Sequence, residues 1–100
     1  MILEIARFDI KAGQEDAFLT AATGAVATVF RDAAGCRSLR LERCIEQPSR
    51  FYLLIEWNTL ENHTVDFKAS GRWATWRALV GDFFDGTPEV RHTQLAARGF

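Results

Sequence analysis

The two histidines of the chain, His63 and His92, are the side chains best suited to move a proton at neutral pH. His63 stands in a predicted helix that directly follows a predicted strand. In one interpretation it is a hydrogen-bond partner or base for a substrate hydroxyl. In the other it braces the corner between strand and helix, or a subunit interface. Both roles remain open, and His92, in the last predicted strand, is expected to be structural.

Arg7 is the second candidate, because it places a charge in the middle of an otherwise apolar predicted strand. A buried arginine needs a partner, since an unpaired charge is costly to remove from water. Glu56 on another predicted strand is the structural candidate for this partner, and the anionic group of a ligand is the functional one. The sequence does not choose between them.

Large aromatic side chains could form the walls of an apolar pocket for a planar ligand. The candidates are Trp57, Phe67, Trp73 and Trp76. Taken individually, each tryptophan is more often a residue of the core or of an interface. No metal site is expected, because two histidines on separate elements do not form a cluster of ligands. The sequence also has no glycine-rich phosphate loop and no Ser-His-Asp order.

Residues 51–57, which would position several of these side chains, are predicted to form a buried strand. By the period of two, the odd-numbered residues share one face and the even-numbered residues share the other. Both faces are largely apolar, so both are expected to be covered. Asn58 is expected to be the N-cap of the following helix, with Glu61 three residues on as in a capping box.

The other segments continue the alternation of strands and helices. Further strands are predicted over residues 2–10, 36–46 and 89–96, and helices over residues 14–33 and 59–84, the second interrupted at Ser70-Gly71. In the strand 36–46, Leu39, Leu41 and Ile45 are expected to face opposite to Cys36 and Cys44. The order β-α-β-β-α-β predicts a ferredoxin-like α+β fold, an antiparallel sheet with helices on one face, as one domain over residues 1–100.

The composition excludes several other classes of protein. A net charge of −1 provides no basic surface for nucleic acid, and no apolar run approaches the ~18 residues of a membrane span. Cys36 and Cys44 lie eight residues apart in one predicted strand, roughly 27 Å at about 3.4 Å per residue, too far for a disulfide. Reduced cysteines and the absence of a signal-peptide pattern predict a cytoplasmic protein.

A homodimer is the expected assembly. One layer of helices covers only one face of the sheet, while the strand 51–57 is apolar on both. A second copy could cover the other face, with Tyr52 or Leu54, or their opposite-face neighbours, at the centre of the interface. We expect this interface to exceed roughly 2,000 Å² in total.

One stretch carries a family resemblance. A strand ending in Glu56-Trp57, then Asn-Thr-Leu-Glu-Asn-His63-Thr, then Phe67-Lys-Ala-Ser70 and an aromatic-rich helix resembles the antibiotic biosynthesis monooxygenase domain. The resemblance implies a dimeric α+β barrel and oxidation of aromatic polyketides or quinols with dioxygen, without metal or flavin. A haem-degrading branch of that family uses Asn, Trp and His where this chain matches Arg7, Phe67 and Arg77, so haem degradation is not expected.

The function hypothesis is therefore a cofactor-independent monooxygenase for a small phenol or quinol. His63 would be the proton partner and Arg7 the charge partner of the developing oxyanion, with the four aromatic residues as walls. The alternative is a non-catalytic dimeric binding or scaffold domain, because no residue set here forms a self-sufficient catalytic motif. A cavity beside His63 is the feature that the enzyme hypothesis requires.

Overall fold

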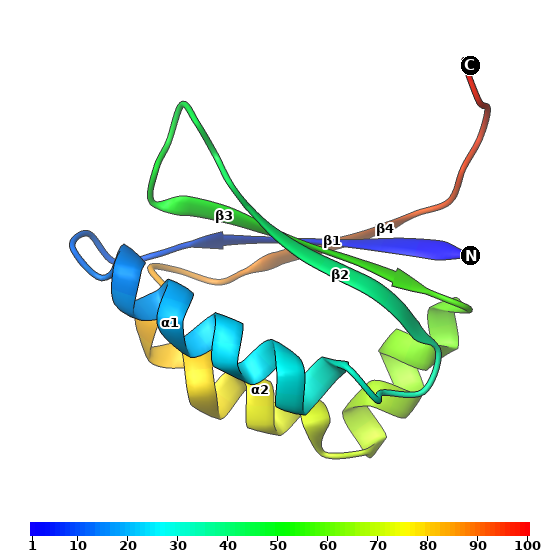
Figure 1. Ribbon diagram of the computed structural model, residues 1–100, viewed down its shortest axis with the longest axis horizontal. Helices are drawn as coiled ribbons and strands as arrows, with labels where there is room; N and C mark the ends of the chain where they lie inside the picture. Colours follow the sequence, from blue (N-terminus) through cyan, green and yellow to red (C-terminus); the bar gives the residue numbers. More distant parts are fainter.

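The computed structural model describes residues 1–100 as a four-stranded antiparallel sheet with helices on one of its faces (Figure 1). The strand order is β2-β3-β1-β4. The strands are β1 (Ile2–Asp9), β2 (Cys36–Arg43), β3 (Arg50–Trp57) and β4 (Glu89–Thr93), and the helices are α1 (Glu15–Ala25), η1 (Val26–Phe30), η2 (Asn62–Phe67), α2 (Arg72–Val80) and η3 (Gly81–Phe83). This order confirms the predicted ferredoxin-like α+β fold.

The odd-numbered residues of β3 face the helices. Phe51, Leu53, Ile55 and Trp57 are each at most 2% exposed and form the centre of the hydrophobic core. On β1 the even-numbered residues Glu4, Ala6 and Phe8 point to the same side, because β1 and β3 pair Glu4 with Ile55 and Ala6 with Leu53. The sequence could not decide which face looks inward, and the structure assigns it.

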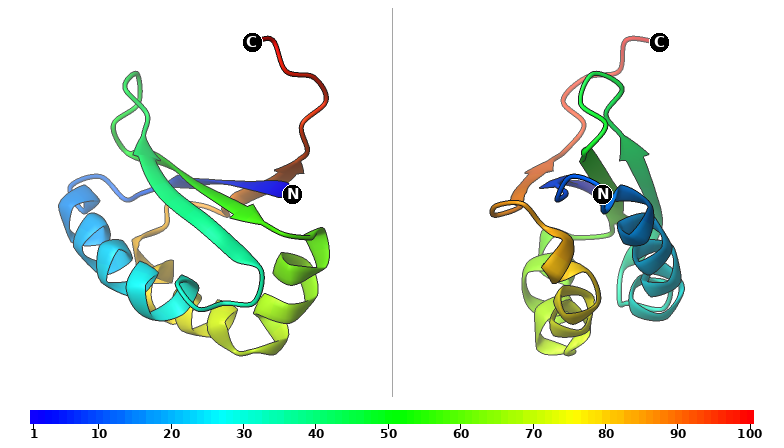
Figure 2. Two further views of the ribbon diagram at one scale, coloured as in Figure 1. Left: turned by 45° about the vertical axis from the view of Figure 1, so that its right-hand side comes forward. Right: turned by 90° about the vertical axis from the view of Figure 1, so that its left-hand side faces the viewer.

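The opposite face of the sheet has no helix over it, as the two views in Figure 2 show. At its centre the register brings together Ile5 with Leu54, flanked by the pairs Leu3 with Glu56 and Arg7 with Tyr52. We call this surface, centred on Leu3, Ile5, Tyr52 and Leu54, the outer face. Its apolar residues are half-buried by their own neighbours.

Strand β2 differs from its prediction in length and in orientation. It ends at Arg43, and Ile45, in the following turn, is 89% exposed. A β-bulge lies between Cys36 and Ser38, which pair with Trp57 and Glu56 respectively. The extra residue moves Cys36 to the core face, where Leu39 also lies. The prediction that Cys36 and Leu39 face opposite sides of the sheet is therefore wrong. Both cysteines are free thiols.

The corner between β3 and η2 is capped one residue later than predicted. The Asn62 carboxamide oxygen accepts the Thr59 backbone N–H at 3.0 Å, and the Thr59 hydroxyl accepts the Asn62 N–H at 3.2 Å. Asn58 instead accepts a hydrogen bond from Arg37 at 2.9 Å. Thr59 and Asn62 therefore form the reciprocal cap that was expected of Asn58 and Glu61.

The two predicted helices are each broken by π-helical segments. The first passes from α1 into η1, and the second begins with η2, which carries His63 and Phe67. Single π-helical turns are rare and occur frequently at functional sites. The predicted interruption at Ser70-Gly71 is confirmed, since Gly71 has a φ of 82° between η2 and α2. No helix is long and apolar enough to cross a bilayer.

Candidate active site

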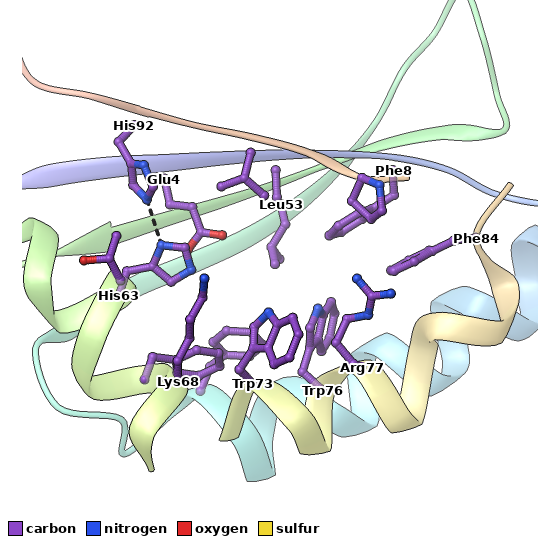
Figure 3. Close-up of a pocket in the computed structure, with 16 residues that line it drawn as sticks. Glu4, Phe8, Leu53, His63, Lys68, Trp73, Trp76, Arg77, Phe84 and His92 are labelled. Carbon is purple, nitrogen blue, oxygen red and sulfur yellow. Dashed lines mark hydrogen bonds and ion pairs between the residues drawn. The ribbon is translucent and has the colours of Figure 1, made fainter. Parts of the chain in front are cut away.

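A cavity of about 250 Å³ lies beside His63, between the sheet and the second helical region. Its walls come from β1, β3 and β4 on one side and from η1, η2 and α2 on the other (Figure 3). The volume is just below the ~300–1,000 Å³ of ordinary small-molecule pockets, which suits a ligand of one or two rings. The feature required by the enzyme hypothesis is thus present.

Glu4 is a buried carboxyl on this cavity. It is only 4% exposed, because its even position on β1 directs it to the core face. The Trp57 indole N–H donates a hydrogen bond to its Oε1 at 2.9 Å. Burial raises the pKa of Glu4 to about 7, although the Trp57 hydrogen bond lowers it somewhat. Glu4 can therefore exchange its proton near neutral pH.

The two histidines meet at the same place. Nδ1 of His63 lies 2.7 Å from Nε2 of His92, and Nε2 of His63 lies 3.4 Å from Oε1 of Glu4. His92 reaches the site because it pairs directly opposite Glu4 across β1 and β4. The His63 ring also stacks on Trp57, with 5.4 Å between ring centroids. Glu4, His63 and His92 form a continuous polar row, which we call the Glu4–His63–His92 row.

Burial sets the protonation of this row. It lowers the pKa of His63 to about 4, with smaller contributions from the charges of His92 and Lys68. Burial likewise lowers the pKa of His92. Both rings are therefore neutral at neutral pH and share a hydrogen bond that one donates and the other accepts. Glu4 and His63 are the only polar residues buried in the core, an arrangement typical of functional sites.

Aromatic and cationic side chains complete the cavity. Phe67, Trp73 and Trp76 line it as expected, and Trp73 is 42% exposed at its edge. Lys68 and Arg77 each approach the Trp73 ring to 5.8 Å, and neither has a carboxylate partner in the protein. The Trp73 ring holds these two cations at the cavity by cation–π contacts, and because they have no carboxylate partner they can attract an anion there.

Two predicted site residues do not line the cavity. Arg7 points to the outer face, where it forms an ion pair with Glu89 at 2.9 Å. The expected partner Glu56 instead accepts a hydrogen bond from Ser38 at 2.6 Å. Trp57 is fully buried behind His63, and it contacts the site through its N–H, which Glu4 accepts, and through its ring, which stacks on His63.

Four ionisable residues that line the cavity were not predicted as site residues: Glu4, His92, Lys68 and Arg77. The signal for Glu4 was present, because it alternates with Ala6 and Phe8 and so belongs to the face opposite Arg7.

No group of His, Cys, Asp or Glu is arranged to hold a metal ion. His63 offers a different nitrogen to each of its neighbours, so the three side chains do not converge on one point.

The fold and this cavity define a ferredoxin-like α+β protein with a cavity between sheet and helices. A family model described as antibiotic biosynthesis monooxygenase matches residues 1–79. The chain belongs to this family, as its resemblance implied.

Two relatives match this chain over nearly its whole length. The uncharacterized protein YczJ of Bacillus subtilis (strain 168) is 36% identical over 94% of this chain and 98% of its own length. A crystal structure from Bordetella bronchiseptica, assigned to the same family, has a TM-score of 0.90 at 38% identity and covers 96% of this chain and 97% of its own.

A more distant structure shares the fold alone. It is a monooxygenase from the gene ActVA-Orf6 of Streptomyces coelicolor in complex with the ligand nanaomycin D. Its TM-score is 0.84 at 17% identity, and the match covers 99% of this chain and 90% of that one.

Proposed function

We propose that the protein is a monooxygenase that oxidises a small aromatic phenol or quinol with dioxygen in the cavity beside His63. The observation that carries the proposal is the buried Glu4–His63–His92 row on an aromatic-walled cavity. Membership of the monooxygenase family supports the reaction type. The structure from Streptomyces coelicolor, a monooxygenase of the same fold, holds the ligand nanaomycin D, which supports a small organic ligand.

In this proposal the substrate supplies the electrons. Removing the hydroxyl proton turns a phenol into a phenolate, which gives electrons to dioxygen far more readily. For a dihydroxynaphthalene, one oxygen atom of dioxygen becomes the new hydroxyl of a hydroxynaphthoquinone, and the other leaves as water. The substrate loses four electrons and dioxygen gains four, so the reaction is balanced without a further reductant.

The protein would contribute a proton acceptor, a dry pocket and a positive field. The Glu4–His63–His92 row provides the proton acceptor, and the rings of Phe67, Trp73 and Trp76 keep the pocket dry. Lys68 and Arg77 take the role of charge partner that sequence analysis gave to Arg7, because they lie at the cavity and have no carboxylate partner. The cavity volume favours one- and two-ring substrates.

We also propose that the active form is a homodimer joined through the outer face. Leu54 and Ile5 are only half-buried in the single chain, so completing their burial would gain part of the roughly 1.5–3 kcal/mol that full burial of such a side chain is worth. A second copy of the sheet would bury them, and the paired residues Arg7 and Glu89 would lie at the edge of this apolar centre.

Oxygen uptake with a panel of hydroquinones, dihydroxynaphthalenes and anthrones tests the proposed reaction. We expect uptake well above the uncatalysed rate for at least one compound. Trp73→Ala, which removes a cavity wall, should lower it, whereas Leu79→Ala on the exposed side of α2 should not. A folded protein that is inert across the panel would instead be the non-catalytic binding domain.

A further inference from the structure

One oxygen of Glu4 is held by the protein and the other faces the cavity. Oε1 accepts the Trp57 N–H and lies near Nε2 of His63. Oε2 has no hydrogen-bond partner in the protein. Every fully buried side-chain oxygen does have a partner, so Oε2 is not fully buried. Oε2 is therefore accessible from the cavity that Glu4 lines. Figure 3 shows Glu4 directed from its strand toward the helices, next to His63.

We infer that Glu4 is the group that takes the proton from the substrate hydroxyl, and that His63 and His92 are positioning residues for its carboxylate. The inference rests on the proposed function, because it concerns a phenol or quinol bound in the same cavity. It reassigns the role of proton partner, which the sequence had given to His63.

The acid–base properties of the two groups favour Glu4. A general base works best when its pKa lies near the working pH, and burial places the pKa of Glu4 at about 7. The pKa of His63 is lowered to about 4, so its imidazolium is an unfavourable product at neutral pH. His63 is therefore better suited to hold a hydrogen bond than to keep a proton.

The histidines can orient the carboxylate through a single chain of donors. If His92 donates from Nε2 to Nδ1 of His63, the proton of His63 resides on Nε2, which faces Oε1 of Glu4. Oε1 then has two N–H groups directed at it, from Trp57 and His63. Oε2 is left free for the substrate hydroxyl.

The groups around Glu4 come from every element packed against it. They are Trp57 of β3, His63 of η2, His92 of β4 and Cys36 of β2, whose thiol pKa is raised by burial and by the charge of Glu4. Lys68 lies nearer the histidines, whose pKa values its charge lowers. No arginine or lysine forms an ion pair with Glu4, so burial remains the dominant influence on its pKa.

The proposed step moves one proton and no electrons. The O–H bond of the phenol breaks, an O–H bond forms on Oε2 of Glu4, and the substrate becomes a phenolate beside a neutral carboxylic acid. Glu4 and the substrate together carry one negative charge before and after the transfer. This conservation predicts that a phenolate entering from solution binds together with a proton, because two adjacent buried anions are unfavourable.

Calorimetric titration with nitrophenol tests this prediction without any oxidation. Nitrophenol is a phenol that resists oxygenation, and titrations in buffers of different ionisation enthalpy count the protons that accompany binding. Above the pKa of Glu4 and of the free phenol, we expect the wild type to take up close to one proton for each bound nitrophenolate. Glu4→Gln should take up none, and Glu46→Gln in an exposed turn should behave as the wild type.

His63→Gln separates the two possible acceptors. We expect it to retain proton uptake with a shifted pH midpoint, since His63 only positions the carboxylate. Uptake that survives Glu4→Gln and disappears in His63→Gln would overturn the assignment, as would a wild type that binds no nitrophenol. A protein that shows the expected uptake but consumes no oxygen would keep Glu4 as the acceptor and refute the monooxygenase.

Discussion

Trp57 donates its indole N–H to Oε1 of Glu4 at 2.9 Å, and the other nearby nitrogen, Nε2 of His63, lies 3.4 Å from the same oxygen. One hydrogen bond and one longer contact, both at a single oxygen, compensate poorly for the removal of a carboxylate from water, so the charged form of Glu4 is destabilised. The result is a carboxyl that titrates near neutrality on a cavity of the size of a small aromatic ligand.

Replacing Glu4 by glutamine should stabilise the protein above about pH 7. The amide still accepts the Trp57 N–H but cannot ionise. The pKa of Glu4 rises from an ordinary 4.5 to about 7 on folding, so its protonated form stabilises the fold fully below 4.5. This stabilisation is lost as the pH rises through 7, and at ~1.4 kcal/mol per pH unit the loss is about 3 kcal/mol.

Urea unfolding of both proteins across pH measures this effect. His63 opposes Glu4, because its pKa falls on folding to about 4 and rising pH therefore stabilises the fold up to about 6.5. The free energy of unfolding of the wild type should thus vary little between about pH 4.5 and 6.5, whereas that of Glu4→Gln should increase over that range. A variant less stable than the wild type at alkaline pH would show that ionised Glu4 is not destabilised by burial.

Trp57→Phe should raise the pKa of Glu4 further. The substitution keeps most of the buried ring but removes the N–H, and that hydrogen bond is the one influence that lowers this pKa. Leaving a buried oxygen without its donor should also cost about 1–3 kcal/mol of stability. Trp73→Phe, which removes an indole that makes no hydrogen bond, is the matched control. NMR titration of the Glu4 carboxyl measures this pKa in both variants. An equal pKa in Trp57→Phe and Trp73→Phe would contradict the prediction.

Gly35→Ala should destabilise the protein strongly, because Gly35 has a φ of 76° and a Cβ there would overlap the side-chain amide of Asn62. Asn62 caps η2 and precedes His63, so the damage should reach the site. Gly24→Ala, inside α1 with open space around it, should instead stabilise by about 0.5–1 kcal/mol. Thermal melting of the two variants should move in opposite directions, and equal shifts would refute the role of Gly35.

Sedimentation at micromolar concentration should give twice the chain mass of 11.3 kDa. Leu54→Arg, at the centre of the outer face, should dissociate the homodimer because it places an unpaired charge there. Leu79→Arg on the exposed side of α2 should leave the mass unchanged. A stable, folded wild-type monomer would disprove the proposed assembly.

The sequence predicted the fold well because local patterns determine it. Alternation along β3 sorts Leu53 and Leu54 onto different faces, and Gly71 breaks the second helical region as its type suggests. The bulge that turns Cys36 inward was not predictable, because an extra residue in a strand depends on pairing with its neighbour.

The site was predicted only in part. His63, Phe67, Trp73 and Trp76 come together at the cavity as expected. Arg7 and Glu4 lie on opposite faces of β1, and the sequence alone does not say which face looks toward the helices. His92 reaches His63 only because β4 pairs with β1 in the observed register, a long-range relationship that the sequence does not contain.

Turnover of a dihydroxynaphthalene under isotopically labelled dioxygen, followed by mass spectrometry of the product, tests the central claim most directly. The account predicts that wild type places one labelled oxygen atom in the quinone product, at a rate that rises with pH through about 7 as Glu4 loses its proton. Glu4→Gln should lose this pH dependence and most of the rate. An unlabelled product, or a rate in Glu4→Gln equal to that of the wild type, would contradict the account.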